Sequence, residues 1–280
     1  MVRVIAIMET TSREKSILDR IVDARRLSIA HRKRVLPEVA LKIAVEKKAP
    51  PARDFTAAVS RDGLNVIAEL KKASPSLGVI REEYSPSALA QQLQHAGAAA
   101  LSVLTEEDFF SGSLADLKEA RKIAEIPIVR KDFIVDPWQV WEARAAGADS
   151  FLLIAAVLSD SALTELLDLG RSLKMEPLVE VHSREELDRV LGAGGRIIGV
   201  NNRDLRNFQV RLETSLELVE TIPDDCVAVS ESGLRTHDDL VRLRAAGFDA
   251  FLIGEHLMKA ADPGAALGHF LGRSGTEKQG

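Results

Sequence analysis

The stretch Val66-Ile67-Ala68-Glu69-Leu70-Lys71 decides the fold, because a short apolar run here ends in charged residues. Comparable runs follow along the chain at Ile128-Val129-Arg130-Lys131, Leu178-Val179-Glu180, Ile197-Ile198-Gly199-Val200-Asn201 and Val227-Ala228-Val229-Ser230-Glu231. A short apolar run between turn signals is typical of a strand buried on both faces. Charged side chains are rarely buried unless they are paired or bind something. The pattern therefore predicts successive buried strands whose carboxyl ends share one site.

Glycines that follow alanines mark the ends of the intervening helices. They recur at nearly regular intervals as Ala96-Gly97, Ala146-Gly147, Ala193-Gly194 and Ala246-Gly247. Each interval is long enough for two strand–helix units, and further strands are expected at 100–105, 150–154, 197–201 and 250–254. Eight parallel strands with right-handed crossovers favour an α/β fold, the (βα)8 TIM barrel, over an open doubly wound sheet.

Three regions divide the chain. We expect residues 1–60 to form a mostly helical N-terminal extension packed on the barrel, 61–272 the (βα)8 catalytic barrel, and 273–280 a disordered tail. The apolar spacing predicts a first helix that starts near Ser12 and a second helix that ends before Ala49. Ser85-Pro86 and Asp136-Pro137 predict helix starts, and Ser183 with Glu186 has the spacing of a capping box.

The composition argues for an ordinary folded protein. Of 280 residues, 46% are hydrophobic and 28% are charged, and the formal net charge of −5 gives no sign of a nucleic-acid footprint. No stretch predicts a membrane helix, and residues 1–8 lack a signal-peptide pattern. Cys226 is the only cysteine, so we expect a buried, inert thiol and a cytoplasmic location. The histidines lack metal-ligand spacing and no Gly-x-Gly-x-x-Gly follows a strand, so neither a metal nor a cofactor is indicated.

Lys131 is the first candidate for acid–base chemistry. We expect apolar neighbours and other cations to disfavour its ammonium form, which makes it a proton donor near neutral pH. The alternative is a lysine that reaches the surface or pairs with Asp132. Its position at the end of a buried strand, beside other charged strand ends, favours the functional interpretation.

Glu69 and Lys71 stand two residues apart, so both face the same side of their strand. Such a pair is either structural or an acid–base pair, and the neighbouring strand ends favour the second reading. Glu180 has no neutralising group nearby in sequence, so it requires a cationic partner or a raised pKa. His182 follows closely, but a role in the loop or at the helix start is favoured over a contact with the site.

The remaining strand ends predict anion binding. Asn201 presents an amide and Arg203 a guanidinium suited to a carboxylate, whereas Asn202 fits an ordinary turn. Ser232, Gly233, Gly254 and Glu255 lie in the loops after the last two strands, where such barrels often bind phosphate through backbone N–H groups. We expect the Glu255 carboxylate to turn away from that anion.

Long motifs keep one order from about residue 17 to residue 267. They are Ile67-Ala68-Glu69-Leu70-Lys71-Lys72-Ala73-Ser74-Pro75-Ser76, Leu104-Thr105-Glu106, Phe110-Ser111-Gly112-Ser113, Arg130-Lys131-Asp132-Phe133-Ile134, Glu180-Val181, Gly199-Val200-Asn201-Asn202-Arg203-Asp204-Leu205, Ser230-Glu231-Ser232-Gly233 and Phe251-Leu252-Ile253-Gly254-Glu255. With these motifs the chain resembles the indole-3-glycerol-phosphate synthases of tryptophan biosynthesis. It departs from them in the segment before residue 12 and at Leu77, where many relatives carry a basic residue.

The resemblance implies a carboxy-lyase that closes the ring of 1-(2-carboxyphenylamino)-1-deoxyribulose 5-phosphate and releases carbon dioxide and water, without cofactor or metal. It implies Lys131 as general acid, with Glu180, Glu69, Lys71 and Asn201 as the other catalytic residues. The implied substrate-binding residues are Arg203, Glu231, Ser74, Phe110, Phe133 and Leu152, and the implied phosphate-binding residues are Lys71, Ser232, Gly233, Gly254 and Glu255. The expected partner is a small phosphorylated substrate, with no nucleic acid or membrane, and the expected state is a monomer or weak homodimer.

Two other functions remain open from the residues alone. One is an aldolase-type barrel in which Lys131 forms a Schiff base. The other is a non-catalytic barrel that binds a phosphorylated metabolite, although pure binding does not need both an acid and a base. A sister barrel, phosphoribosylanthranilate isomerase, would require a cysteine early in the barrel, whereas Cys226 lies near its end.

Overall fold

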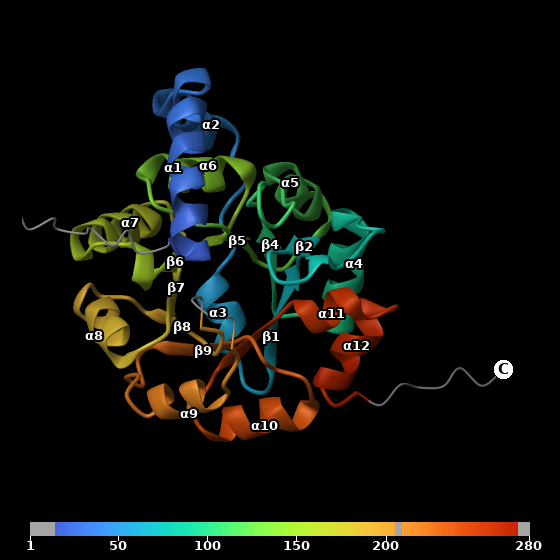
Figure 1. Cartoon of the computed structure of the whole chain (residues 1–280). Helices are drawn as coiled ribbons and strands as arrows, with labels where there is room; N and C mark the ends of the chain where they lie inside the picture. Colours follow the sequence, from blue (N-terminus) through green and yellow to red (C-terminus); the bar gives the residue numbers. More distant parts are fainter. Residues whose placement is uncertain (1–14, 205–208, 274–280) are drawn as a thin grey trace, which may run out of the picture.

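The eight main strands close into a parallel barrel with helices around it, which confirms the predicted fold (Figure 1). The computed structural model describes residues 15–204 and 209–273. The expectations for residues 1–14, and for the tail from 274 onward, therefore lie outside the described residues. Around the barrel the order is β1-β10-β9-β8-β7-β6-β5-β4. The strands are β1 Asn65–Leu70, β4 Ala100–Leu104, β5 Ile128–Lys131, β6 Ser150–Ile154, β7 Leu178–Val181, β8 Ile197–Asn201, β9 Val227–Glu231 and β10 Ala250–Ile253. A small hairpin, β2 Ala73–Ser74 with β3 Gly78–Val79, follows β1.

The outer helices begin at side chains that cap them. Ser85 and Asp136 accept hydrogen bonds from the first backbone N–H groups of their helices, as predicted. The helices after the extension are α4 Pro86–Ala96, α5 Leu114–Ile123, α6 Pro137–Ala146, α7 Asp160–Ser172, α8 Arg184–Gly192, α9 Glu213–Val219, α10 His237–Ala245, α11 Glu255–Lys259 and α12 Pro263–Phe270, with a short 3-10 turn η1 at Ala155–Val157. Gly97 and Gly147 take the left-handed conformation that ends α4 and α6.

From residue 15 onward, three helices precede the barrel: α1 Ile17–Val35, α2 Glu38–Lys48 and α3 Phe55–Val59. Ser16 caps α1, so this helix begins later than the expected start near Ser12. The pair α1 and α2 packs on α6 through Ile29, Leu41 and Trp138 (Figure 1). Phe55 and Val59 of α3 join the apolar cluster inside the barrel. The extension therefore covers part of the outside and contributes to the interior.

The strand register brings the functional strand ends to one rim. Glu180 on β7 pairs with Gly199 on β8, and Asn201 on β8 pairs with Glu231 on β9. Below these residues the interior is apolar, with side chains such as Ile67 and Val129 fully buried. The charged groups at the rim therefore lie above an apolar interior of low dielectric constant, where electrostatic interactions are stronger than in water. No helix in the two described ranges is long and apolar enough to cross a membrane.

Candidate active site

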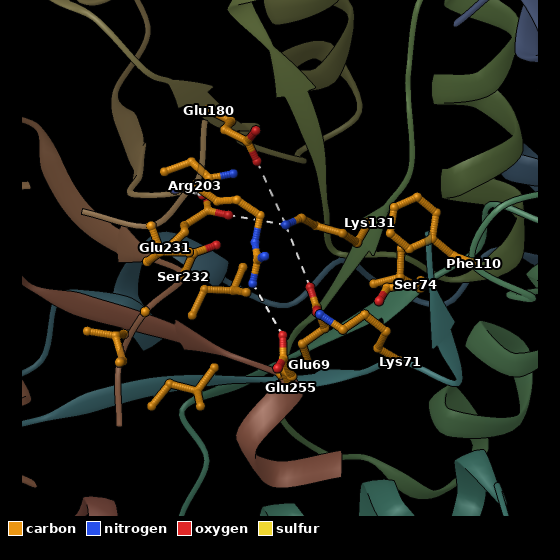
Figure 2. A pocket seen from close by; sticks show the side chains of 18 of the residues that line it. Glu69, Lys71, Ser74, Phe110, Lys131, Glu180, Arg203, Glu231, Ser232 and Glu255 are labelled. Carbon is orange, nitrogen blue, oxygen red and sulfur yellow. Dashed lines mark hydrogen bonds and ion pairs between the residues drawn. The ribbon is translucent and has the colours of Figure 1, made fainter. Parts of the chain in front are cut away.

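One cavity of about 480 Å³ opens at the carboxyl-terminal rim of the barrel. It is lined by all the residues that the sequence singled out for catalysis or binding. They are Glu69, Lys71, Ser74, Phe110, Lys131, Phe133, Leu152, Glu180, Asn201, Arg203, Glu231, Ser232, Gly233, Gly254 and Glu255. Figure 2 shows the side chains of Glu69, Lys131, Glu180 and Glu231 pointing toward one another from four different strands. Sequence reasoning missed two basic residues of the same lining, Arg235 and Lys259, because they lie beyond the strand ends on which it relied.

Lys131 stands at the centre of a ring of carboxylates (Figure 2). Its Nζ lies 3.1 Å from Glu231 Oε2, 3.6 Å from Glu69 Oε2 and 3.8 Å from Glu180 Oε2. Burial alone would lower the pKa of Lys131, but the three carboxylates together raise it above its ordinary value. The expectation of a disfavoured ammonium form was therefore wrong: the neighbours are anions, and they favour the protonated form of Lys131. Asp132, its expected alternative partner, pairs elsewhere.

Glu231 is the least satisfied carboxyl group of the ring. Burial is the main cause that raises the pKa of Glu231 to about 7, and the neighbouring Glu180 and Glu69 raise it as well. Lys131 lowers this pKa, but by less than burial and the two carboxylates together raise it. Glu231 Oε1 has no hydrogen-bond partner among the described residues and lies over Gly199, where a Cβ would be only 2.2 Å away. The missing side chain at Gly199 therefore provides the space in which Glu231 turns toward Lys131.

Glu69 and Lys71 form the ion pair expected from their spacing, with Lys71 Nζ 2.8 Å from Glu69 Oε1. Burial raises the pKa of Glu69, but Lys71 and Lys131 lower it further, so the net shift is downward. A Cβ on Gly254 would lie 2.3 Å from Glu69 Oε1. A second glycine thus makes room for a carboxylate at the rim.

Glu180 has a cationic neighbour that the sequence analysis set aside. His182 Nε2 lies 3.3 Å from Glu180 Oε1, and Nδ1 of the same ring lies 3.3 Å from Glu186 Oε2. Burial raises the pKa of Glu180, but His182 and Lys131 bring it down to about 2. Burial lowers the pKa of His182, and the two carboxylates raise it to about 10. The preference for a loop role alone was wrong, because the ring bridges two acids.

Helix α8 begins as predicted at Ser183, whose side chain accepts from the Glu186 backbone N–H. The expected capping box is not reciprocal. The Glu186 carboxylate instead accepts from the backbone N–H of His182 at 2.7 Å, which fixes it beside the imidazole.

Arg203 crosses the mouth of the cavity. Its Nη2 lies 3.2 Å from Glu255 Oε2, and Glu255 also accepts from Lys259 at 2.7 Å (Figure 2). The Glu255 carboxylate thus faces Arg203 and Lys259 at the mouth of the cavity, and its expected orientation away from a phosphate stays a prediction. Asn201 accepts from the backbone N–H of Arg203 at 3.0 Å, which orients the start of this loop.

Asn202 is more than an ordinary turn residue, contrary to expectation. Its amide nitrogen donates to Ser230 Oγ and to the backbone oxygens of Glu231 and Ser232. Its oxygen accepts from the backbone N–H of Ser215. Asn202 is buried and joins the ends of β8 and β9, so it holds the Glu231–Ser232 backbone in place.

The loop after β9 has a backbone suited to close approach by a ligand. Ser232 and Gly233 have φ angles of 67° and 81°, both in the left-handed region. A Cβ at Gly233 would lie 2.5 Å from Val210 Cγ1, so this position is crowded as well as conformationally special. Gly254 precedes α11, which places the loop after β10 on the same rim.

A buried ionic network ties the extension to the rim. Arg25 of α1 donates through Nε to Asp132 Oδ1 at 2.9 Å, and Arg130 donates to Asp132 Oδ2 at 2.9 Å. Thr105 Oγ1 adds a hydrogen bond of 2.6 Å to Asp132. Burial raises the pKa of Asp132, but the arginines bring it down to about 2. The sequence signal for this network is Arg25 itself, a charged residue within the apolar stripe of α1.

Cys226 departs slightly from expectation, because it is half-buried. Burial raises the pKa of its thiol, which keeps it in the unreactive protonated form near neutral pH.

A closed (βα)8 barrel that holds a lysine among three carboxylates at its carboxyl rim defines a class: a barrel enzyme built for acid–base chemistry on a small molecule. Residues 18–270 match the sequence profile of one family in particular, Indole-3-glycerol phosphate synthase. The chain belongs to this family, as its motifs indicated.

Curated relatives support the assignment over most of the chain. An indole-3-glycerol phosphate synthase of Acidithiobacillus ferrooxidans is 48% identical over 257 residues, which cover 90% of this chain and 97% of the relative. That of Chloroherpeton thalassium is 52% identical over 213 residues, 75% of this chain and 82% of the relative.

Solved structures extend the likeness in fold alone. A crystal structure of 3-hexulose-6-phosphate synthase matches 75% of this chain and 99% of its own, with a TM-score of 0.60 and 15% identity. The enzyme of that name from Salmonella typhimurium matches 75% of this chain and 97% of its own, with a TM-score of 0.60 and 10% identity.

Proposed function

We propose that this chain converts 1-(2-carboxyphenylamino)-1-deoxyribulose 5-phosphate to indole-3-glycerol phosphate in tryptophan biosynthesis, releasing carbon dioxide and water. The observation that carries the proposal is the Lys131 ammonium, held within 3.1–3.8 Å of three buried carboxylates at the floor of the cavity. The reaction requires proton transfers at two stages, and this cluster holds a proton donor beside groups that accept protons.

Lys131 acts in ring closure as the general acid. As the ring carbon that bears the carboxylate attacks the ketone, the ketone oxygen gains negative charge and takes a proton from Lys131 Nζ. Loss of carbon dioxide then restores the aromatic ring.

Glu69, Lys71 and Glu180 serve the dehydration. The hydroxyl left by ring closure departs as water after gaining a proton, and a base removes a proton from the neighbouring ring carbon. Glu180 and Glu69 face each other across Lys131, so one lies on each side of the reacting ring. Lys71, paired with Glu69, takes part in this transfer and also reaches the phosphate.

The other lining residues orient the substrate. Arg203 and Asn201 hold the anthranilate carboxylate end, where a guanidinium forms charge-assisted hydrogen bonds. Phe110 and Phe133, whose ring centroids are 6.0 Å apart, lie with Leu152 along the apolar side of the cavity and pack the aromatic ring, near Ser74. Backbone N–H groups of Ser232, Gly233, Gly254 and Glu255 receive the phosphate, with Glu231 below them.

The same proposal includes a cytoplasmic location and a monomer or weak homodimer. It also bears on the aldolase-type alternative. A Schiff base requires a neutral amine, whereas the three carboxylates favour the protonated form of Lys131.

The test is an assay for indole product, by absorbance or fluorescence, with the carboxyphenylamino substrate. Lys131→Ala should nearly abolish kcat, while substrate affinity stays within about tenfold, because the lost proton acts mainly in the transition state. Wild-type kcat in this variant would exclude Lys131 as the acid. Covalent capture at Lys131 on borohydride treatment with substrate would support the Schiff-base alternative instead.

A further inference from the structure

The reaction consumes one proton per turnover, and that proton must reach a buried site. Ring closure places one proton on the ketone oxygen, and dehydration takes up one at the hydroxyl and releases one from the ring. The net balance is one proton taken up, because the carboxylate leaves as neutral carbon dioxide. This requirement rests on the proposed function and is independent of which group acts first.

The cavity itself is a poor route for that proton during turnover. Lys131 and the three carboxylates lie at its floor, and Glu180 and Glu231 are almost fully buried. A substrate bound above them separates them from the solvent at the mouth. A second path that avoids the cavity would let Lys131 regain its proton while ligands still occupy the site.

His182 and Glu186 provide such a path behind the rim. Neither residue is part of the cavity lining. The two nitrogens of the imidazole lie 3.3 Å from Glu180 Oε1 and 3.3 Å from Glu186 Oε2, so the ring stands between an inner carboxylate and an outer one. Among the described residues Nε2 is buried without a hydrogen-bond partner, so it is paired with Glu180 by charge alone, and a small turn of the ring or of the carboxylate must precede the transfer. The side chains of His182 and Glu186 are 16% and 19% exposed, compared with 3% for Glu180. The path therefore leads from the buried site toward solvent.

We propose that His182 and Glu186 form a proton relay that resupplies Lys131 through Glu180. The imidazolium gives its Nε2 proton to Glu180, and the Glu180 carboxyl group turns and passes that proton to the neutral amine of Lys131, 3.8 Å away. The neutral ring keeps its proton on Nδ1 and turns, so that its bare Nε2 takes a proton delivered from solvent through the Glu186 carboxyl group; the recharged imidazolium then turns back toward Glu180. Each transfer moves one proton between named atoms, and no other reactant is needed.

The end points of the relay favour transfer in this direction, whereas Glu180, whose pKa is lowered to about 2, carries the proton only as a short-lived intermediate. The charged and polar groups that face the relay are Glu180 on β7, Glu186 on α8, Lys131 on β5 and Asn201 on β8. His182, with a pKa raised to about 10, is charged near neutral pH and carries a proton on both nitrogens. Lysine is ordinarily a stronger base than histidine, and the carboxylates raise the pKa of Lys131 above its ordinary value as well, so its neutral amine draws the proton inward.

The geometry of the relay is fixed by short-range structure. Two residues separate the end of β7 at Val181 from the start of α8 at Arg184. The backbone N–H of His182 holds Glu186 Oε2 at 2.7 Å, so the outer acceptor stays against the ring. The proposal thus assigns His182 and Glu186 as positioning and relay residues, outside contact with substrate.

The experiment compares His182→Gln and Glu186→Gln with matched controls. Glutamine at 182 retains an N–H donor for Glu180 but cannot pass a proton, and glutamine at 186 retains an acceptor for the His182 backbone. We expect kcat to fall by about 10-fold to 100-fold in both variants, with KM unchanged, because general acid–base groups typically contribute such factors. In His182→Ala, which leaves the volume of the ring free, added imidazole should restore kcat in a saturable way. Glu185→Gln, on the exposed side of the same helix, and His95→Gln, on the outside of α4, should match the wild type.

Two results would overturn the relay. One is wild-type kcat in both glutamine variants. The other is a lower kcat in His182→Ala that imidazole does not restore, which would mean that His182 has a purely structural role. Melting temperatures identify a variant that fails to fold, and the second variant then decides. If the wild-type chain forms no indole product, the proposed function fails. If the wild type forms product and the relay variants form it at the same rate, the relay fails and the proposed function stands.

Discussion

Replacing Arg25 with methionine should unfold the protein more easily, because Arg25 is one of two cations that neutralise a buried carboxylate. Arg25 is 3% exposed and Asp132 is 1% exposed, and their contact joins α1 to the residue next to Lys131. Methionine keeps most of the aliphatic volume of arginine, so the change removes charge and hydrogen bonds with little loss of packing.

The loss of unfolding free energy depends on the partners that Asp132 keeps in the variant. Breaking a buried ion pair by removing one partner costs about 3–5 kcal/mol. Asp132 keeps Arg130 at 2.9 Å and Thr105 at 2.6 Å, so its charge is still partly compensated. We therefore expect the lower end, about 3 kcal/mol. With an unfolding entropy of roughly 2.1 cal/mol/K per residue, this corresponds to a decrease in Tm of about 5 °C for a chain of 280 residues.

The measurement is urea and thermal unfolding, with Arg26→Met as control, since Arg26 is the exposed neighbour on the same helix. A double-mutant cycle with Asp132→Asn isolates the coupling between the two side chains. A loss below about 1 kcal/mol, or a loss equal to that of Arg26→Met, would refute the reasoning, since surface substitutions usually have effects within about 0.5 kcal/mol.

Three further predictions concern the mouth of the cavity and acid stability. Arg203→Ala should weaken binding of the substrate by about 1.5–3 kcal/mol, measured by calorimetry, and should spare an analogue that lacks the carboxylate; equal losses for both would contradict the assigned contact. Glu255→Gln should strengthen inorganic phosphate binding, measured as a larger rise of Tm with phosphate concentration at constant ionic strength, because a carboxylate beside the anion is removed; an unchanged or smaller rise would place the phosphate elsewhere. The pKa of Asp132 falls from 3.8 to about 2 on folding, so its contribution of about 2 kcal/mol to stability is present above about pH 4 and is lost as the pH falls to about 2. Asp132→Asn should flatten this part of the plot of unfolding free energy against pH, and an unchanged plot would exclude Asp132 as the source of this acid sensitivity.

The sequence predicted the barrel because its signals are local and repeated. Each apolar run, helix cap and terminal glycine depends on neighbours within one turn or one strand, and Ser85 and Asp136 cap the helices they were expected to cap. Convergence of the strand ends then follows from parallel topology alone. The residues around the cavity could thus be named without coordinates, although their individual roles still depend on the experiments above.

The pairing of charges could not be predicted in the same way, and Lys131 shows the reason. Its sequence neighbours are Arg130 and Asp132, and from them a disfavoured ammonium form was a reasonable hypothesis. In the barrel, alternate side chains point to opposite faces, so Arg130 and Asp132 meet Arg25 outside while Lys131 points inward. Its real neighbours come from β1, β7 and β9, and all three are acids. The direction of the Lys131 pKa shift depends on residues of these distant strands and on the glycines that let their carboxylates approach. The sequence therefore predicts which residues form the site, but it does not predict how their pKa values shift.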